Sequence, residues 1–401
     1  MLAVTGCLRQ MPESFPLHHA ENSGNMIHGN APFEMFDDAI HSSNRAAILT
    51  RGHKSFTDFA NAEASHVILT LANSLRSNDD DGTRYARLAA QISEIKVPVV
   101  VFGLGIQAES DDINTITLHP EARELMKRLA DKAELLGVRG KLSARVLEKE
   151  CGVTNTRTTG CPSLLSRPHA LVALRDTIQA GTHLKGRPSF NGTKLHQDSE
   201  KQALHRALQA DHFIVEPVNK FNHAYFLATS RGERTDPPYF LREYIGSAGG
   251  EAGSRESQDE LAQRFRSNYR LFRSPESWYQ FNSEAVSYGY GTRFHGNMAT
   301  ILSGRPALWI THDARTRELV EFARLPHVSQ EEFDEMGWEG VPEKLNYEPF
   351  FDRITALYNN FNSYLSMNGI KPVRTFASAA RRGKGPKSEE SEAPMDPSLR
   401  R

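Results

Sequence analysis

An arginine and a histidine stand two residues apart in the stretch 290–297, as Arg293 and His295, followed by Gly296 and Asn297. A strand is predicted before this stretch and a helix after it, so both side chains point the same way and can reach one ligand. Arginine offers a rigid fork of donors to a carboxylate or phosphate, and histidine exchanges a proton near neutral pH. The stretch predicts an anion site with a proton-transfer group; a histidine satisfied within the core is the alternative.

A second arginine, Arg139, stands between two glycines where a predicted strand runs directly into a predicted helix. Backbone amides at the start of a helix attract anions, and a guanidinium beside them adds to that preference. A surface arginine in an exposed ion pair is the plain alternative, and such pairs contribute little to stability. Arg139 is therefore a candidate for the same kind of ligand as Arg293.

A glycine pattern, Gly103-Leu-Gly105-Ile-Gln107-Ala, follows the predicted strand 97–102. Missing side chains there would let a ligand or a neighbouring backbone come close. The pattern formally matches a dinucleotide-binding turn, but an acidic run at 109–112 stands where the phosphate-binding helix should begin. We therefore expect a structural turn or a close approach to substrate, and no nicotinamide cofactor.

Other constellations point to no chemistry. The acidic run 79–81 is typical of a solvated loop before a helix, and no histidine or cysteine spacing matches a metal site, so no metal is predicted. Neither a G-x-S-x-G elbow nor a phosphate-binding P-loop is present. The three cysteines, Cys7, Cys151 and Cys161, form no disulfide pattern and indicate a reducing compartment.

The elements that must position these residues alternate between short apolar runs and amphipathic stretches, which is typical of parallel sheets covered by helices. Strands are predicted at 46–50, 66–71, 97–102 and 135–138, and helices from Pro120 onward and at 141–150, the second ending at Gly152. A glycine- and proline-rich stretch, 186–194, is interpreted as a hinge. Beyond it, strands at 212–215, 284–288 and 306–310 and several helices predict a second α/β unit.

The domain prediction follows from this pattern: an amino-terminal α/β domain over 1–185, a second over 186–345, a helix over 346–372 that crosses back to the first, and a disordered tail over 373–401. A chain of 401 residues exceeds the size of a single core, which supports two domains. The stretch 229–256 is interpreted as an acceptor-binding loop.

Net charge and hydropathy argue against several classes of protein. A net charge of -1 gives no basic footprint for nucleic acid, so that partner is not expected. The longest apolar run, 97–106, is far shorter than the roughly 20 residues of a membrane-spanning helix, and no signal peptide is recognised. We expect a cytoplasmic protein and leave peripheral contact with the inner face of the membrane open. The oligomeric state is not specified.

Taken in order, the motifs resemble the polysaccharide pyruvyl transferase family. Asn22-Ser-Gly24-Asn25 resembles its amino-terminal turn, and 67–73, ending at Asn73, and 99–107 resemble its inner strands. Arg139 with the following helix resembles its arginine-led helix. The most specific motif, Thr292-Arg-Phe-His-Gly296 followed by Gly304-Arg-Pro306, resembles its R-x-H-G segment.

The resemblance implies two Rossmann-like domains facing a cleft, as in GT-B glycosyltransferases. It implies phosphoenolpyruvate as donor, no further cofactor, and a saccharide acceptor that is often lipid-linked. Arg139 and Arg293 would bind the donor and His295 would handle the proton. The substrate-binding positions would be Asn22, Gly24, Asn25, Asn73, Gly103, Gly105, Gln107, Gly296 and Asn297.

Three positions depart from the family pattern: Cys161 and Asn25 stand where aspartate is common, and Phe294 where leucine is usual. The cysteine puts in question whether its turn contacts substrate, and the phenylalanine would reshape the donor pocket. Two other functions remain open. One is a glycosyltransferase of the same architecture that uses a nucleotide sugar; the other is a catalytically silent binding module.

Overall fold

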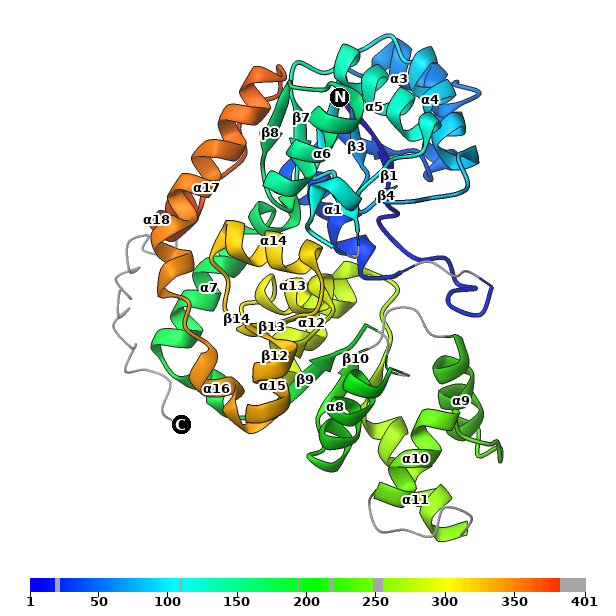
Figure 1. Cartoon of the computed structure of the whole chain (residues 1–401), viewed down its shortest axis with the longest axis vertical. Coiled ribbons are helices and arrows are strands. Elements are labelled where there is room, and N and C mark those ends of the chain that lie inside the picture. The colour runs from blue at the N-terminus through cyan, green and yellow to red at the C-terminus, as the bar shows by residue number, and fades with distance from the viewer. Residues whose placement is uncertain are drawn as a thin grey trace, which may run out of the picture.

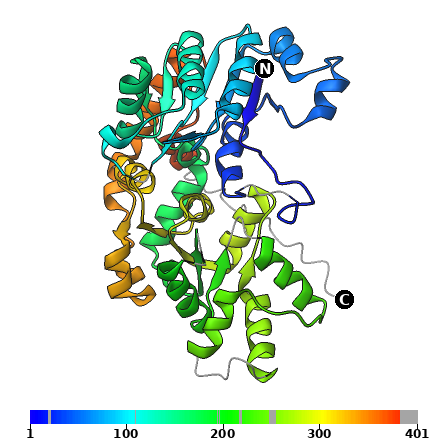
Figure 2. The same cartoon turned by 45° about the vertical axis from the view of Figure 1, so that its right-hand side comes forward.

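The computed structural model describes residues 1–18, 22–108, 110–193, 195, 197–215, 220–247 and 255–382. These residues form two α/β lobes, stacked one above the other in Figure 1, and each lobe has its own parallel sheet. Figure 2 shows the same stacking after a turn of 45°. The strands of the first sheet lie within 1–185 and those of the second within 186–345, the ranges predicted as domains.

The first lobe is built on a four-stranded parallel sheet in the order β2-β1-β3-β5. Its strands are mostly apolar because helices cover both faces, and Val67 pairs with Val99 at the buried centre. A bridge from Leu104 to Val138 joins the short pair β7 and β8 to this lobe. The elements are β1 Leu2–Gly6, α1 Asn25–Met35, β2 Ala39–His41, α2 Arg45–Thr50, α3 Phe56–Glu63, β3 His66–Thr70, β4 Leu75–Arg76, α4 Thr83–Glu94, β5 Val99–Phe102, β6 Ile106–Gln107, α5 Pro120–Lys132, β7 Leu136–Val138, α6 Lys141–Cys151 and β8 Thr156–Thr158. Helix α7, Pro168–Gln179, follows and lies beside the second lobe (Figure 1).

Most predicted elements of this lobe are confirmed. β3, β5 and β7 lie in the stretches predicted as strands, α5 begins at Pro120, and Gly152 ends α6 with a left-handed φ of 69°. The predicted strand at 46–50 is wrong, because these residues form helix α2. The side chain of Asn44 caps that helix by accepting a 3.1 Å hydrogen bond from the Ala47 amide. The prediction rested on the short apolar run and did not consider this helix cap.

The second lobe has a six-stranded parallel sheet in the order β11-β10-β9-β12-β13-β14. Its inner strand β9 is formed by residues 187–191 of the stretch predicted as a hinge, so that prediction is wrong for this part. Buried Asn191 ends that strand and donates a 2.9 Å hydrogen bond to Asn297, which is how a polar residue is accommodated in the sheet. The elements are β9 Arg187–Asn191, α8 Asp198–Gln209, β10 Phe213–Val215, α9 Lys220–Ser230, α10 Tyr239–Ser247, α11 Arg255–Asn268, β11 Tyr269–Arg270, α12 Pro275–Ala285, β12 Val286–Gly291, α13 Phe294–Ile301, β13 Ala307–Thr311, α14 Ala314–Ala323, β14 His327–Ser329, α15 Gln330–Met336 and α16 Val341–Lys344.

Helix α17, Glu348–Met367, runs along one side of the molecule from the second lobe to the first (Figure 1). Tyr364 donates a 2.6 Å hydrogen bond to the Val101 carbonyl of β5, and Asn360 donates one of 2.8 Å to Thr158 of β8. The predicted GT-B-like arrangement, two α/β lobes with a returning carboxy-terminal helix, is thereby confirmed.

The tail prediction is wrong in its first part, because residues 376–382 form helix α18, Phe376–Arg382, which lies against α7. Residues 383–401 lie outside the described part of the chain, as do 248–254 of the predicted acceptor loop.

The acidic run before α4 stabilises its loop, as predicted, because Asp81 accepts a 2.9 Å hydrogen bond from the Thr83 amide.

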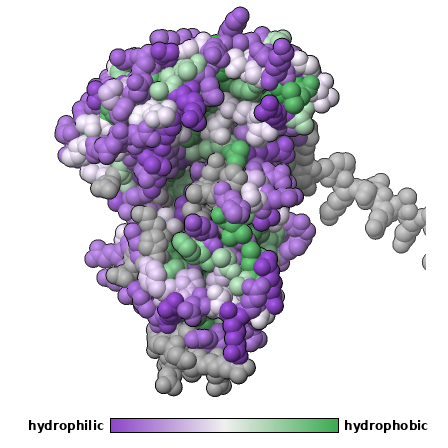
Figure 3. All heavy atoms as spheres, turned by 90° about the vertical axis from the view of Figure 1, so that its right-hand side faces the viewer, coloured by the Kyte–Doolittle hydropathy of each residue, from purple (hydrophilic) through white to green (hydrophobic). Residues whose placement is uncertain are grey.

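No described helix combines the length and apolar character needed to cross a bilayer. On the face shown in Figure 3, polar residues cover most of the surface, and apolar residues gather near the junction of the two lobes.

Candidate active site

A cavity between the lobes is lined by side chains from both lobes. Three of its residues directly follow strands: Arg139 follows β7, Thr292 follows β12 and His312 follows β13. Carboxyl ends of parallel strands are where ligands bind in open α/β sheets, and here two such edges face each other. The lining residues are Asn22, Asn25, Asn73, Arg139, Thr193, Thr292, Arg293, Phe294, His295, His312, Arg315, Thr316 and Leu319.

The lining is cationic. It holds three arginines, Arg139, Arg293 and Arg315, and this described lining includes neither Asp nor Glu. Arg315 is partly offset by Asp313, whose carboxylate accepts a 2.9 Å hydrogen bond from its Nε. An anion entering the cavity would therefore meet an excess of positive charge.

Arg139 is buried, with 3% of its surface exposed, and two hydrogen bonds fix its side chain. Its Nε donates a 2.9 Å hydrogen bond to the Gly103 carbonyl, and its Nη1 donates one of 2.6 Å to Asn73 Oδ1. Its Nη2 is buried and has no hydrogen-bond partner among the described residues. Burial lowers the pKa of Arg139, but an arginine stays protonated at neutral pH. A buried charged donor left without a partner is costly, so Nη2 is positioned for a ligand.

The glycines after β5 make room for this arginine. A Cβ atom on Gly105 would lie 2.7 Å from Arg139 Cδ and 2.9 Å from Asn73 Oδ1. A Cβ on Gly103, where φ is 60°, would lie 2.6 Å from Pro162 Cδ. The glycine pattern is thus explained by packing of Gly105 against Arg139 and of Gly103 against Pro162. Helix α5 begins only at Pro120, so the pattern does not form a strand-to-helix phosphate loop of the dinucleotide type.

Arg293 precedes α13 and lies against the end of β9. Its Nη2 donates a 2.8 Å hydrogen bond to the Thr193 carbonyl, and its Nε approaches the Gly192 carbonyl at 3.4 Å. Gly291, with φ of 138°, permits this approach, because a Cβ there would lie 2.2 Å from the Asn191 carbonyl oxygen. The turn after β12 therefore requires glycine in order to bring Arg293 to the cavity.

His295 occupies the first turn of α13 and is 5% exposed. Its Nε2 lies 3.5 Å from Cys161 Sγ, and its ring centroid lies 6.0 Å from that of His28. Burial lowers the pKa of His295 well below its ordinary value, and the charge of Arg139 lowers it further. The imidazole is therefore neutral at pH 7 in the protein alone.

Sequence reasoning missed His28. This buried histidine lies on α1 with Nδ1 3.6 Å from Cys161 Sγ. Burial, followed by the charge of Arg139, lowers its pKa well below the ordinary value. The only sequence signal was its place three residues after Asn25, too weak to select it. His312, Arg315 and Thr316 were also missed. His312 follows β13 directly and the other two lie in the first turn of α14, so the strand-end rule could have pointed to this segment.

The structure places the predicted substrate-binding residues in two groups. Asn22, Asn25 and Asn73 line the cavity, and Gly24 lies beside His295, where a Cβ would come 3.3 Å from that residue's Cβ. A second group lies outside the cavity lining and consists of Gln107, Gly296 and Asn297, together with Gly103 and Gly105, whose packing is described above.

Physical reasons explain this second group. Gln107 is exposed on β6. Gly296 packs against Asn191, because a Cβ there would lie 2.9 Å from the Asn191 Cβ. Asn297 is fully buried and donates hydrogen bonds of 2.9 Å to the Gly291 carbonyl and 3.2 Å to the Leu308 carbonyl, so it ties β12 to β13. These contacts show that Gly296 and Asn297 stabilise the turn after β12.

All three departures from the family pattern lie at the site, and Asn25 is among the residues that line the cavity. Cys161 contacts His295, so its turn belongs to the site even though it does not line the cavity. Phe294 lines the cavity, and its ring packs against Trp309 with centroids 5.9 Å apart. A larger aromatic side chain is accommodated there because the buried indole supports it.

Fold and cavity together define a two-lobed α/β protein with a cationic cleft built from strand ends. The chain belongs to the polysaccharide pyruvyl transferase family, whose model matches residues 22–314. This is a transferase family whose members modify polysaccharides. No curated protein matches the chain significantly.

Among solved structures, S. aureus MnaA with UDP is 12% identical, covering 93% of this chain and 99% of that chain, with a TM-score of 0.42. A UDP-N-acetylglucosamine 2-epimerase is 13% identical, covering 95% and 93%, with a TM-score of 0.40. E. coli heptosyltransferase WaaC with ADP is 11% identical, covering 86% and 99%, with a TM-score of 0.29. The family match, rather than these likenesses, identifies the chain.

Proposed function

We propose that this protein transfers a pyruvyl group from phosphoenolpyruvate to hydroxyl groups of a saccharide, either in a polysaccharide or in a lipid-linked repeat unit. The observation that carries the proposal is the buried Arg139, whose Nη2 lacks a partner among the described residues and whose cavity also holds Arg293 and His295. Membership in the pyruvyl transferase family supplies the reaction class.

Phosphoenolpyruvate suits this cavity because it carries a carboxylate and a phosphate on a small frame. Arg139 and Arg293 approach from different lobes, so each guanidinium would bind one anionic group and the donor would bridge the lobes. Bidentate binding to arginine fixes orientation as well as charge, which is the main requirement for aligning the reacting carbon with an acceptor hydroxyl.

The reaction needs controlled proton movement. The methylene carbon of phosphoenolpyruvate gains a proton, and the adjacent carbon bonds to an acceptor oxygen, which loses its proton. Phosphate then leaves, and a second hydroxyl of the same sugar attacks that carbon to close the ketal. The two hydroxyl protons end on the new methyl group and on the phosphate, so the reaction balances.

His295 would handle the proton for the methylene carbon. In the protein alone its imidazole is neutral, because burial and Arg139 lower its pKa. A bound dianion would offset the arginine charges and raise that pKa, so that donor binding itself would favour the protonated imidazole. The three arginines would also stabilise the negative charge of the departing phosphate.

The cytoplasmic location and a peripheral contact with the membrane belong to the same proposal. They follow from the sparse free cysteines and from the lipid-linked acceptors implied by the family resemblance. The acceptor itself would enter from the open side of the cavity, against residues of either lobe.

Thermal unfolding with phosphoenolpyruvate tests the proposal directly. We expect phosphoenolpyruvate to raise the melting temperature by mass action, and uridine diphosphate sugars to leave it unchanged. Arg139→Lys should abolish the shift, because lysine cannot reproduce the fork of donors. The matched control is Arg187→Lys, an arginine that bonds Asp211 and Asn268 away from the cavity.

The reaction itself is tested by incubating the protein with phosphoenolpyruvate and candidate oligosaccharides. We expect phosphate release together with the mass gain of one pyruvyl ketal on an oligosaccharide. Stabilisation by a nucleotide sugar but not by phosphoenolpyruvate would overturn the proposal in favour of glycosyl transfer. Stabilisation by phosphoenolpyruvate with no release across the acceptors would instead indicate a binding module.

A further inference from the structure

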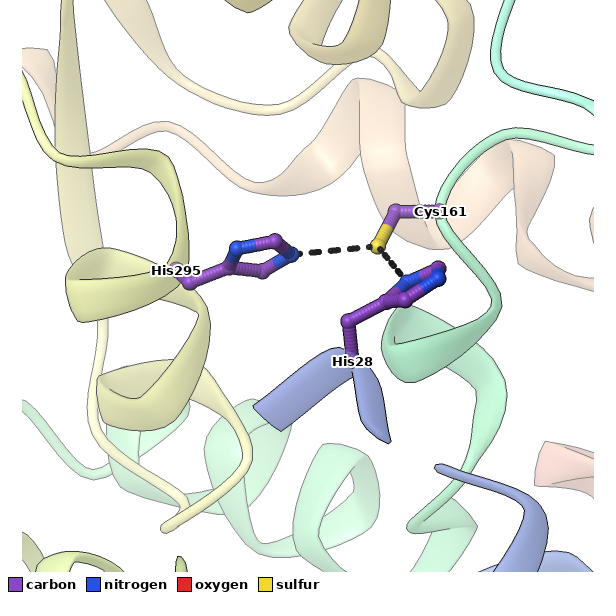
Figure 4. Close-up of side chains that lie close together, drawn as sticks. All are labelled: His28, Cys161 and His295. Atoms are coloured by element: carbon purple, nitrogen blue, oxygen red, sulfur yellow. Dashed lines mark hydrogen bonds between the residues drawn. The ribbon is translucent and has the colours of Figure 1, made fainter. Parts of the chain in front are cut away.

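Three buried side chains from distant parts of the chain meet beside the cavity. His28 comes from α1, Cys161 from the turn after β8, and His295 from the first turn of α13. In Figure 4 both rings turn a nitrogen toward the sulfur, at 3.6 Å from His28 Nδ1 and 3.5 Å from His295 Nε2. The three donor atoms all lie within 4.8 Å of one another.

The two distances from the sulfur to the imidazole nitrogens fit a tetrahedral metal ion. With bonds of about 2.3 Å to sulfur and about 2.0 Å to nitrogen, sulfur and nitrogen ligands of one zinc ion lie roughly 3.5 Å apart. The observed separations of 3.5 and 3.6 Å match this value. A thiol has a single proton, so it can donate to only one of the two rings. One cation bound to all three donors would be shared by the sulfur and by one nitrogen of each ring.

A neighbouring hydroxyl supports the sulfur as a ligand. Ser163, which is fully buried, places its Oγ 3.0 Å from Cys161 Sγ, close enough for the hydroxyl to donate to the sulfur. Such support of a ligand by a neighbouring donor is typical of metal sites. Two imidazoles and a thiolate are a donor set that Zn²⁺ and Co²⁺ bind well, whereas Mg²⁺ and Ca²⁺ prefer oxygen ligands.

The positively charged arginines of the cavity weaken the binding of a metal cation, but they allow an anion to bind beside it. Zn²⁺ with one thiolate keeps a positive charge, and the guanidinium groups of Arg139 and Arg293 line the same cavity as His295. We therefore expect reversible binding that a chelator removes, rather than a permanent structural ion. His295 lines the cavity, so the fourth coordination position is reached from there by water or a small anion.

We propose that His28, Cys161 and His295 form a binding site for a zinc-class divalent ion, and that an ion bound there withdraws His295 from proton transfer. The second part rests on the proposed function, because it assigns the proton to His295. The first part is independent of it. The metal-bound protein would be the inactive form, and removal of the ion would restore activity.

Cobalt serves as the probe, because a thiolate bound to Co²⁺ gives a charge-transfer band in the near ultraviolet and a four-coordinate ion gives strong visible bands. The full chain is treated with a chelator, freed of it and titrated with Co²⁺ under reducing conditions. We expect both features to saturate at one ion per chain and to disappear when Zn²⁺ is added. A titration of the unaltered protein without a charge-transfer band overturns the proposal, whatever the variants do.

Matched variants locate the site. Cys161→Ser should lose the charge-transfer band, and His28→Gln should weaken cobalt binding at least tenfold, the scale on which metal sites respond to disrupted ligation. Cys151→Ser is the control, because Cys151 is also a buried thiol but ends α6. Retention of the band in Cys161→Ser overturns the assignment. Far-ultraviolet circular dichroism confirms that each variant is folded.

Activity forms a separate arm. Zn²⁺ should inhibit pyruvyl transfer over the same concentration range in which it displaces Co²⁺, and a chelator should reverse the inhibition. Cobalt binding without inhibition by Zn²⁺ overturns the second part and leaves the site standing. A chelated protein that shows the cobalt bands but no pyruvyl transfer contradicts the proposed function and not the site.

Discussion

Glu318 of α14 accepts a 2.6 Å hydrogen bond from the backbone amide of Leu142 at the start of α6. The same carboxylate also approaches the Ser143 amide at 3.2 Å, so a side chain of the second lobe caps a helix of the first. That helix follows Arg139 directly. The position of this arginine is therefore linked to the second lobe, which carries Arg293 and His295.

Replacing Glu318 tests this link between the lobes. Glu318→Ala should lower the free energy of unfolding by about 1 to 2 kcal/mol, because two amides at the start of α6 lose their acceptor. Glu318→Gln should cost less, since it keeps one acceptor oxygen and removes a buried charge; burial raises the pKa of this carboxyl. Urea unfolding at pH 7 measures both. A larger loss for glutamine than for alanine would contradict the capping role.

Gly105→Ala should weaken binding of phosphoenolpyruvate without unfolding the protein. The added methyl group would lie 2.7 Å from Arg139 Cδ, so the arginine must move. A shift on the scale of an ångström costs up to about a hundredfold in kcat/KM. Steady-state kinetics measure this.

The control is Gly152→Ala, where φ is 69° and no atom lies within 4 Å of the added Cβ. It should cost about 1 kcal/mol of stability through backbone strain and leave KM unchanged. Equal effects of the two substitutions on KM would show that Gly105 does not act through Arg139.

Sequence patterns predicted the cavity where its residues follow strands. Arg139 comes directly after β7, and Arg293 and His295 come soon after β12, so the strand-end rule applies to all three. His28 could not be found this way, because it lies within α1. Cys161 is separated by 133 residues from His28 and by 134 from His295. Metal motifs are read from short spacings, which is why the sequence predicted no metal.

The errors in the fold have a common cause. β9 contains buried polar residues such as Ser189 and Asn191, whose partners come from distant segments, so the strand resembled a linker. Strand β1, which lies between β2 and β3, was not predicted, because its five residues begin at Leu2 without a preceding turn signal. Local patterns do not reveal contacts that only the folded sheet provides.

Acid should destabilise the protein partly through His212, a buried residue whose Nδ1 lies 2.9 Å from the Tyr290 hydroxyl. Burial, aided by Arg187, lowers its pKa to about 4. A lowered pKa means that the unfolded chain binds a proton first, so stability is complete above about pH 6.5 and is lost as pH falls toward 4. The loss assigned to this residue is about 2 kcal/mol at pH 5.

Urea unfolding at pH 7 and pH 5 measures the effect by comparing the protein with His212→Gln. The variant should be less stable at pH 7, because it loses the packing of the ring on Trp338, and the difference should shrink at pH 5. Other buried histidines also lose stability in acid, but they do so equally in both proteins. A difference independent of pH would show that His212 titrates normally in the folded state.

His295→Ala should separate proton transfer from donor binding. We expect kcat/KM for pyruvyl transfer to fall by about a hundredfold or more, the scale of a lost acid or base, while phosphoenolpyruvate still raises the melting temperature through Arg139 and Arg293. His327→Gln is the control, since that exposed histidine bonds the Leu325 carbonyl away from the cavity and its loss should leave kcat/KM unchanged. An alanine variant that keeps full activity would remove His295 from the chemistry. One that loses the thermal shift as well would make it a binding residue instead.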